Sequence, residues 1–185
     1  LSAGFITRYS NENVCFVRYR LKKTYSLNDD RFLCWYEWLE QHEEVDAVFC
    51  TDLFDVDFFG NPFDLMNPLQ YDFYCNSDKE GTKTRDWLNT RMKWAYRKVF
   101  HGDKIIFNAG VIGGTRTNIL RLFNNMIYDF KRAKLARIKR KNINMGVFNK
   151  CVHDLFSQNR IMYGYPLNSR YKQYEKEGDF LIRHK

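Results

Sequence analysis

Apolar residues recur along the chain in two patterns, one typical of buried strands and one typical of amphipathic helices. Short apolar runs predict strands at residues 13–19, 47–50, 104–107, 160–163 and 180–182. Apolar residues at helical spacing predict helices that contain residues 32–39, 88–99, 120–130 and 147–156. Neither an internal repeat nor a linker divides this alternation. We therefore expect residues 1–185 to form a single α/β domain, with helices on both faces of a mixed, mainly parallel sheet.

Acidic residues crowd together directly after the apolar run at 47–50. Asp52, Asp55 and Asp57 lie within six residues, before a Gly-Asn-Pro turn. Such carboxylates repel each other, and they call for a compensating cation, which basic side chains or a metal can supply. Oxygen ligands suit Mg²⁺ or Mn²⁺.

Two geometries are open for these acids. An extended chain places Asp55 and Asp57 on one face, whereas a turn after Thr51 brings Asp52 and Asp55 together. An acidic turn that binds no metal is a third interpretation, because Asp is a common turn residue.

A stretch of small residues follows the apolar run at 104–107. We expect it to form a Gly-rich turn that joins a strand to a helix capped by Thr115 or Thr117. Small residues there allow a ligand to approach the backbone, although they also suit a tight turn. The acidic cluster, Asn108 and His184 each follow an apolar run. Since ligands bind near the carboxyl ends of strands in α/β sheets, these residues are predicted to share one crevice.

Composition narrows the class of protein. The chain has 185 residues, of which 44% are hydrophobic and 17% aromatic, and this indicates a folded domain with a real core. We expect no membrane span or signal peptide, because no apolar run reaches about 18 residues and the first residues lack a leader pattern. The five cysteines are scattered without a C-x-x-C pair, so most are expected to be core residues.

The net charge of +8 is concentrated in residues 131–141. A basic run of this kind is typical of a solvated helix end. It also suits peripheral contact with an anionic membrane or another phosphate-rich partner.

Five segments, in their order and spacing, resemble the GT-A class of nucleotide-sugar-dependent glycosyltransferases. The segments are TDLFDVDFFGNPFDL at 51–65, FNAGVIGGTR at 107–116, NMGVFN at 144–149, YGYPLNSRYKQYE at 163–175 and LIRHK at 181–185. The resemblance covers residues 28–185 and implies a GT-A-like α/β/α sandwich. One departure is that residues 142–145 read NINM where related sequences often carry an Asp.

The resemblance also implies roles for individual residues. Asp55, with Asp52 or Asp57, would hold Mn²⁺ or Mg²⁺ on the donor diphosphate, and His184 would complete the metal site. The residues implied at the donor are Asn108, Ala109, Gly110, Gly113 and Gly114, with Arg116 and Lys185 as candidate basic contacts. The catalytic base stays open, and the conceivable residues are Asp78, Glu80, Asp103 and Asp154.

The implied donor is a UDP- or GDP-sugar, and the implied acceptor is a glycan or glycoprotein; no nucleic acid partner is expected. The compartment stays open between the cytoplasm and a Golgi lumen reached through an anchor outside this chain. A metal-dependent nuclease or phosphodiesterase is an alternative that the absence of an E-x-K triplet disfavours. A non-catalytic divalent-cation module is another, although the EF-hand loop is absent.

Overall fold

The structure is a computed structural model that describes residues 14, 16–17, 19, 25–77, 104–135, 143–170 and 175–185. Its helices are α2 (Leu27–Gln41), α4 (Arg116–Leu135) and α5 (Asn144–Leu155), with short 3-10 helices η1 (Pro62–Leu65) and η2 (Gln158–Arg160). Its strands are β1 (Ala47–Thr51), β2 (Val56–Phe58), β3 (Phe73–Ser77), β4 (Phe107–Thr115), β5 (Ile161–Tyr163) and β6 (Ile182–His184). The α/β class is confirmed. The predicted helix at 88–99 lies outside the described residues, as do residues 13, 15 and 18 of the predicted strand at 13–19.

The main sheet has the strand order β1-β4-β3-β5. Strand β4 runs antiparallel to both β1 and β3, whereas β3 and β5 are parallel. The sheet is mixed, as expected, but the prediction that it is mainly parallel is wrong for the described strands. An apolar run looks the same in either direction, so the sequence pattern did not reveal that β4 is reversed.

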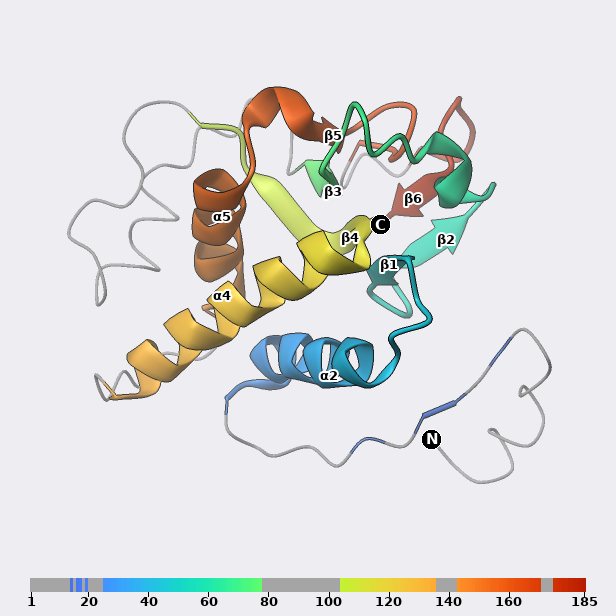
Figure 1. The fold of residues 1–185 in the computed structure, drawn as a ribbon. Helices are drawn as coiled ribbons and strands as arrows, with labels where there is room; N and C mark the ends of the chain where they lie inside the picture. The colour runs from blue at the N-terminus through green and yellow to red at the C-terminus, as the bar shows by residue number, and fades with distance from the viewer. Residues whose placement is uncertain are drawn as a thin grey trace.

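The described helices all cover one face of the sheet. Cys50, Phe73 and Ile112 belong to the core on this side, where α4 lies between α2 and α5 (Figure 1). The alternate residues Tyr74 and Val111 face a second core beneath a small antiparallel sheet of β2 and β6. Among the described residues, the layer opposite the α-helices is therefore a two-stranded sheet. The expectation of helices on both faces stays a prediction, because the helix predicted at 88–99 lies outside the described residues.

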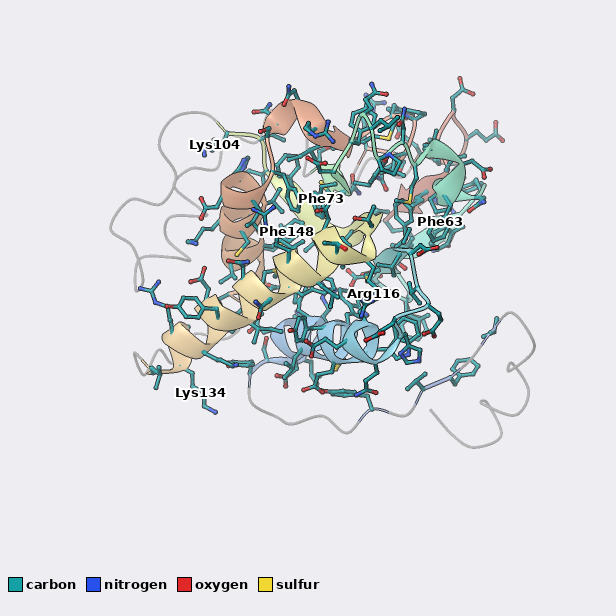
Figure 2. The ribbon with its side chains drawn as sticks, viewed as in Figure 1. Phe63, Phe73, Lys104, Arg116, Lys134 and Phe148 are labelled. Carbon is teal, nitrogen blue, oxygen red and sulfur yellow. The ribbon has the colours of Figure 1, made fainter. Side chains whose placement is uncertain are left out.

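Each described helix follows from its sequence. Ser26 caps α2, since its hydroxyl accepts a hydrogen bond from the Asp29 N–H at 3.3 Å. The apolar stripes of α4 and α5 are buried against the sheet, as their spacing predicts. In Figure 2, Phe73 of β3 and Phe148 of α5 both lie in this core, and their ring centroids are 6.1 Å apart. Aromatic contacts of this kind bind α5 to the middle of the sheet.

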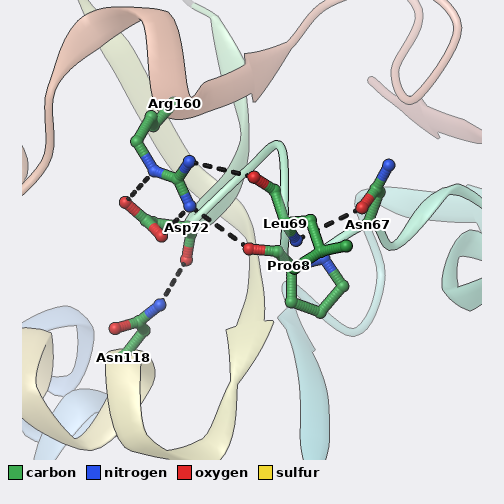
Figure 3. A network of polar contacts seen from close by, with 6 residues as sticks. All are labelled: Asn67, Pro68, Leu69, Asp72, Asn118 and Arg160. Atoms are coloured by element: carbon green, nitrogen blue, oxygen red, sulfur yellow. Dashed lines mark hydrogen bonds and ion pairs between the residues drawn. The ribbon is translucent and has the colours of Figure 1, made fainter.

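An ion pair joins the residues that directly precede the parallel strands β3 and β5. Figure 3 shows the Arg160 guanidinium between the Asp72 carboxylate, at 2.6 and 2.7 Å, and the carbonyls of Pro68 and Leu69. The Asn118 amide of α4 donates to the Asp72 carbonyl at 2.9 Å. The network therefore joins β3, β5 and the start of α4 at one point.

Three cysteines lie in the core, as predicted. Cys50, Cys75 and Cys151 are buried, and burial raises the pKa of Cys50 and of Cys151 to about 12. At neutral pH these thiols are protonated and behave as small apolar side chains. Within the described ranges, none of the helices has both the length and the apolar character to cross a membrane.

Candidate functional site

The acidic segment leaves β1 in a turn at residues 53–55, directly after Asp52. The Asp52 N–H donates to the Gly110 carbonyl of β4 at 3.0 Å. The Asp52 carboxylate pairs with the guanidinium of Arg31 from α2. Asp55 is exposed in the turn, and its carbonyl accepts a hydrogen bond from the Lys185 N–H at 2.8 Å. The turn is thus tied both to the central strand β4 and to the residue that follows β6.

Asp57 lies apart from the other two acids. In the β2–β6 pair it stands opposite Arg183, whose Nη2 and Nε donate to its Oδ2 at 2.6 and 3.0 Å, and Lys185 Nζ is 3.1 Å from Oδ1. These bonds, first those from Arg183 and then that from Lys185, lower the pKa of Asp57. The neighbouring pair is Val56 and His184, so Asp57 and His184 project from opposite faces of the small sheet. The negative charge of Asp57 is thus compensated by two basic side chains, Arg183 and Lys185.

The small-residue stretch is part of strand β4, so the expectation of a Gly-rich turn is wrong. The pairing of β3 with β4 jumps from Cys75–Ile112 to Asn76–Asn108, so that residues 109–111 form a bulge without partners in β3, while Val111 still pairs with Thr51 of β1. The Asn108 side chain supports the bulge, because its Oδ1 accepts a hydrogen bond from the Gly110 N–H at 2.8 Å. Within the bulge, the carbonyl of the buried Ala109 accepts a hydrogen bond from Arg31 at 3.2 Å.

His184 lies directly on this bulge. It is the last residue of β6, where the sequence predicted a strand at 180–182, and only 4% of it is exposed. A Cβ atom built on Gly110 would be 2.1 Å from Cε1 of the His184 ring, so the imidazole needs a glycine there. The His184 Nδ1 is 3.1 Å from Nδ2 of Asn76, and its backbone N–H donates to Ser169 Oγ. Gly110 is therefore the meeting point of the acidic turn, the Asn-Ala-Gly stretch and the C-terminal histidine.

Three other residues proposed at the donor have structural contacts that account for them without a ligand. Gly113 pairs with Phe49, and a Cβ there would be 2.2 Å from the Phe49 ring. A Cβ on Gly114 would be 3.2 Å from the Asp72 carbonyl. The Arg116 guanidinium donates to the Leu39 carbonyl at 2.9 and 3.1 Å and so caps the end of α2.

Sequence reasoning missed Arg31, which contacts both halves of this site. Its guanidinium lies over the rings of Phe32 and Trp35, at 4.9 and 5.4 Å from the ring centroids, and burial lowers its pKa. The available signal was an arginine beside the apolar face of the helix predicted at 32–39, since a charge placed there needs a partner. Asp52 is that partner.

The remaining candidates are less informative. Asp154 is exposed on α5 and pairs with Lys150 at 2.9 Å, whereas Asp78, Glu80 and Asp103 lie outside the described residues. Of the basic run at 131–141, residues 131–135 form the last turn of α4, and its membrane contact stays a prediction. In the parts of the chain that the structure describes, no three His, Cys, Asp or Glu side chains form a group able to hold a metal.

Comparison with known proteins does not identify a family. The chain matches no protein-family model, and no curated protein shows significant sequence similarity to it.

Proposed function

We propose that this chain is a metal-dependent glycosyltransferase that moves a sugar from a nucleotide-diphosphate donor to an acceptor hydroxyl. The observation that carries the proposal is the meeting of three segments at Gly110. The Asp52 N–H bonds the Gly110 carbonyl, and the His184 ring lies against its Cα. These are the segments that the GT-A resemblance assigns to the donor site, although they lie far apart in the sequence.

In this proposal Asp52, Asp55 and His184 hold the divalent ion. Carboxylate oxygens and an imidazole nitrogen suit Mn²⁺, and carboxylates also suit Mg²⁺. A nucleotide site commonly supplies one or two carboxylates and takes its other ligands from the phosphates, so the protein alone need not present a closed group of ligands. Asp57 is left out of the proposed set, because it projects from the face of the small sheet opposite to His184, toward Arg183 and Lys185. The ion, when bound, would stabilise the negative charge that grows on the leaving diphosphate.

Arg31 and the β4 bulge have supporting roles. The Arg31 guanidinium neutralises Asp52 and so reduces the repulsion between the two acids of the turn. Its second bond, to the Ala109 carbonyl, fixes the turn and the bulge relative to each other. Asn108 and Gly110 shape the backbone on which the donor sugar would lie. The acceptor, a glycan or glycoprotein hydroxyl, is proposed from the resemblance alone.

A thermal-shift assay with UDP, GDP and Mn²⁺, each alone and in pairs, tests the proposal on the purified chain. A glycosyltransferase should show its largest rise in melting temperature with one nucleotide together with the metal. A panel of UDP- and GDP-sugars should then yield the free nucleoside diphosphate with one donor. Asp55→Asn should abolish the metal-dependent rise, whereas the matched control Asp64→Asn, an exposed acid of η1 in the same segment, should retain it.

The other functional classes give different results in the same assays. A nuclease or phosphodiesterase would cleave phosphodiester substrates without any sugar donor. A non-catalytic cation module would be stabilised by Mn²⁺ alone and would gain nothing from a nucleotide. Either result would overturn the glycosyltransferase proposal.

A further inference from the structure

The small sheet of β2 and β6 has one face that points away from the second core (Figure 1). Val56 and Ile182 face that core, so the alternate residues Asp57 and Arg183 lie on the opposite, outer face. The Arg183 guanidinium carbon is 5.1 Å from the centroid of the Phe59 ring, and its Nη2 donates to Asp57 at 2.6 Å. Phe59 therefore belongs to the outer face as well.

Two aromatic rings are exposed side by side on this face. Phe59 is 54% exposed and Tyr165 is 46% exposed. Both rings meet the buried ring of Phe180 edge to face, with centroids 5.5 and 5.9 Å away. Such contacts fix the orientation of a ring. A ligand that covers these two rings would thus immobilise little that is not already ordered, which favours binding.

The charged groups around the two rings are already paired with one another. The Glu175 carboxylate accepts hydrogen bonds from the Tyr165 hydroxyl at 2.8 Å and from Arg170 Nε at 2.7 Å. These contacts hold the hydroxyl end of the Tyr165 ring in place. The ion pairs at this surface are Asp57 with Arg183 and Lys185 beside Phe59, and Glu175 with Arg170 beside Tyr165.

The paired charges indicate the chemical class of the ligand. Two carboxylates and three basic groups nearly balance, so the surface favours neither a strongly anionic nor a strongly cationic partner. A protein partner would remove these ion pairs from water at a cost in free energy, and charged residues are depleted from the cores of protein interfaces.

A neutral glycan fits both kinds of group on this face. Each sugar hydroxyl is a donor and an acceptor, so it can bond to carboxylates and to guanidinium groups without separating the ion pairs. The C–H groups on one side of a pyranose ring carry partial positive charge, and they suit the negative face of an aromatic ring.

We infer that the outer face of the small sheet, centred on Phe59 and Tyr165, binds a neutral glycan. Binding itself needs neither metal nor nucleotide, and the inference rests on the proposed function only in giving this glycan the role of the acceptor. The position of the face supports that role. Lys185 contacts Asp57 on this face, and its backbone N–H bonds the Asp55 carbonyl in the acidic turn. The glycan surface therefore adjoins the proposed donor site.

An array of neutral oligosaccharides, probed with the purified chain in EDTA, tests binding without metal or donor. For a glycan that is retained, Phe59→Ala and Tyr165→Ala should each weaken the affinity about tenfold. Tyr128→Ala is the matched control, because Tyr128 is an exposed ring of α4 that also has an arginine over it, Arg132 at 5.8 Å. It should leave the affinity unchanged, and Phe59→Tyr should retain binding because it keeps the ring.

Saturation-transfer NMR on the parent gives a second measurement that needs no substitution. Irradiation of aromatic protons should transfer saturation to the C–H protons of the bound sugar. If Phe59→Ala or Tyr165→Ala does not fold, this measurement decides, and the absence of transfer from the aromatic protons would overturn the inference.

The other occupants of this face give different results. Retention of anionic glycans alone, lost in high salt, would mean an electrostatic surface and would overturn the inference. Self-association that Phe59→Ala abolishes would mean that a second copy covers the face, which would overturn it too. So would the absence of any retained neutral glycan, or equal loss of affinity in Tyr128→Ala.

Sugar transfer is scored separately from glycan binding. Phe59→Ala should raise the KM for the acceptor and leave the release of nucleoside diphosphate by hydrolysis of the donor unchanged. An unchanged acceptor KM would overturn the role of this glycan as acceptor. If the parent binds a neutral glycan through these rings but releases nucleoside diphosphate from no donor, the proposed function fails and the glycan surface stands.

Discussion

The His184 imidazole occupies the space that a side chain on residue 110 would need, with Cε1 only 2.1 Å from the ideal Cβ position. Glycine at 110 is therefore required by the histidine, whether or not a sugar approaches the same backbone. The pairing of a glycine in β4 with a histidine in β6 joins the two sheets at the candidate site.

Gly110→Ala should displace the His184 ring and remove the nucleotide-plus-Mn²⁺ stabilisation. Overpacking of this kind costs about 1–3 kcal/mol of unfolding free energy. Gly113→Ala is the control, because a Cβ there meets the Phe49 ring at 2.2 Å in the same strand. It should lower stability by a similar amount and leave ligand binding intact. Equal loss of binding in the two variants would mean that the effect is general strain in β4. Melting curves with and without ligands decide the matter.

Asp57→Asn should reduce stability without changing the Mn²⁺ dependence of activity, because Asp57 serves Arg183 and Lys185. Asp55→Asn should instead change the Mn²⁺ dependence of activity without reducing stability. The folded-state pKa of Asp57 is lowered by its bonds to Arg183 and Lys185. The stabilisation that Asp57 contributes to the folded state is thus fully present above its unfolded-state pKa of ~3.9. It is lost as the pH falls through its folded-state pKa. The stabilities of parent and Asp57→Asn should therefore differ at pH 7 and converge in strong acid, as urea titrations across pH can measure. A Mn²⁺ requirement that shifts in Asp57→Asn would contradict this assignment.

Asn149→Ala should destabilise the fold by about 3 kcal/mol. The buried Asn149 side chain accepts a bond from the Phe107 N–H at 2.8 Å and donates to the Phe107 and Met145 carbonyls at 2.9 Å. Removing it leaves buried polar groups of Phe107 without a partner, at about 1–3 kcal/mol each. The exposed Asn125 of α4 provides a control, since Asn125→Ala should change the urea midpoint only slightly. Comparable midpoints for both variants would mean that Asn149 does not anchor β4.

His153 should make the fold sensitive to mild acid. Burial, together with the nearby Lys104, lowers its pKa, while Asp154 acts in the opposite direction. A folded-state pKa below the unfolded value means that the unfolded chain binds the proton first. The free energy of unfolding therefore falls as the pH drops below the unfolded-state pKa of His153, ~6.5, and levels off below its folded-state pKa. Melting temperatures of the parent from pH 7.5 to 5 should fall more steeply than those of His153→Gln. Parallel pH profiles would show that His153 carries no part of this dependence.

The helices were predictable from the sequence, because the apolar stripes of α4 and α5 are long and regular enough to specify a buried face. The direction of β4 was not predictable, because an apolar run does not indicate whether a strand pairs in parallel or antiparallel. Glycines at 110, 113 and 114 indicated a turn, but their role is to admit the rings of His184 and Phe49 and a neighbouring backbone. A local sequence pattern cannot reveal a packing partner that comes from another strand.

The candidate site was predicted in part. Of the residues that follow apolar runs, Asp52 and His184 both contact Gly110, whereas a crevice shared by all of them stays a prediction. Asp57 and His184 lie on opposite faces of the small sheet because of the register in which β2 pairs with β6. That register is seen in the paired strands and cannot be derived from either strand alone. Arg31 and Asn76 were missed because each acts through a residue distant in the sequence.

The pairing of β2 with β6 joins residues 126 positions apart, as in the Asp57–Arg183 contact. During synthesis on a ribosome, β2 emerges long before its partner strand exists. Until then its backbone edge is unpaired, and the adjacent Phe58 and Phe59, which stay half exposed even in the folded chain, are open to other chains. The candidate site can therefore be assembled only after β6 has been synthesised, and the edge of β2 is open to aggregation until then.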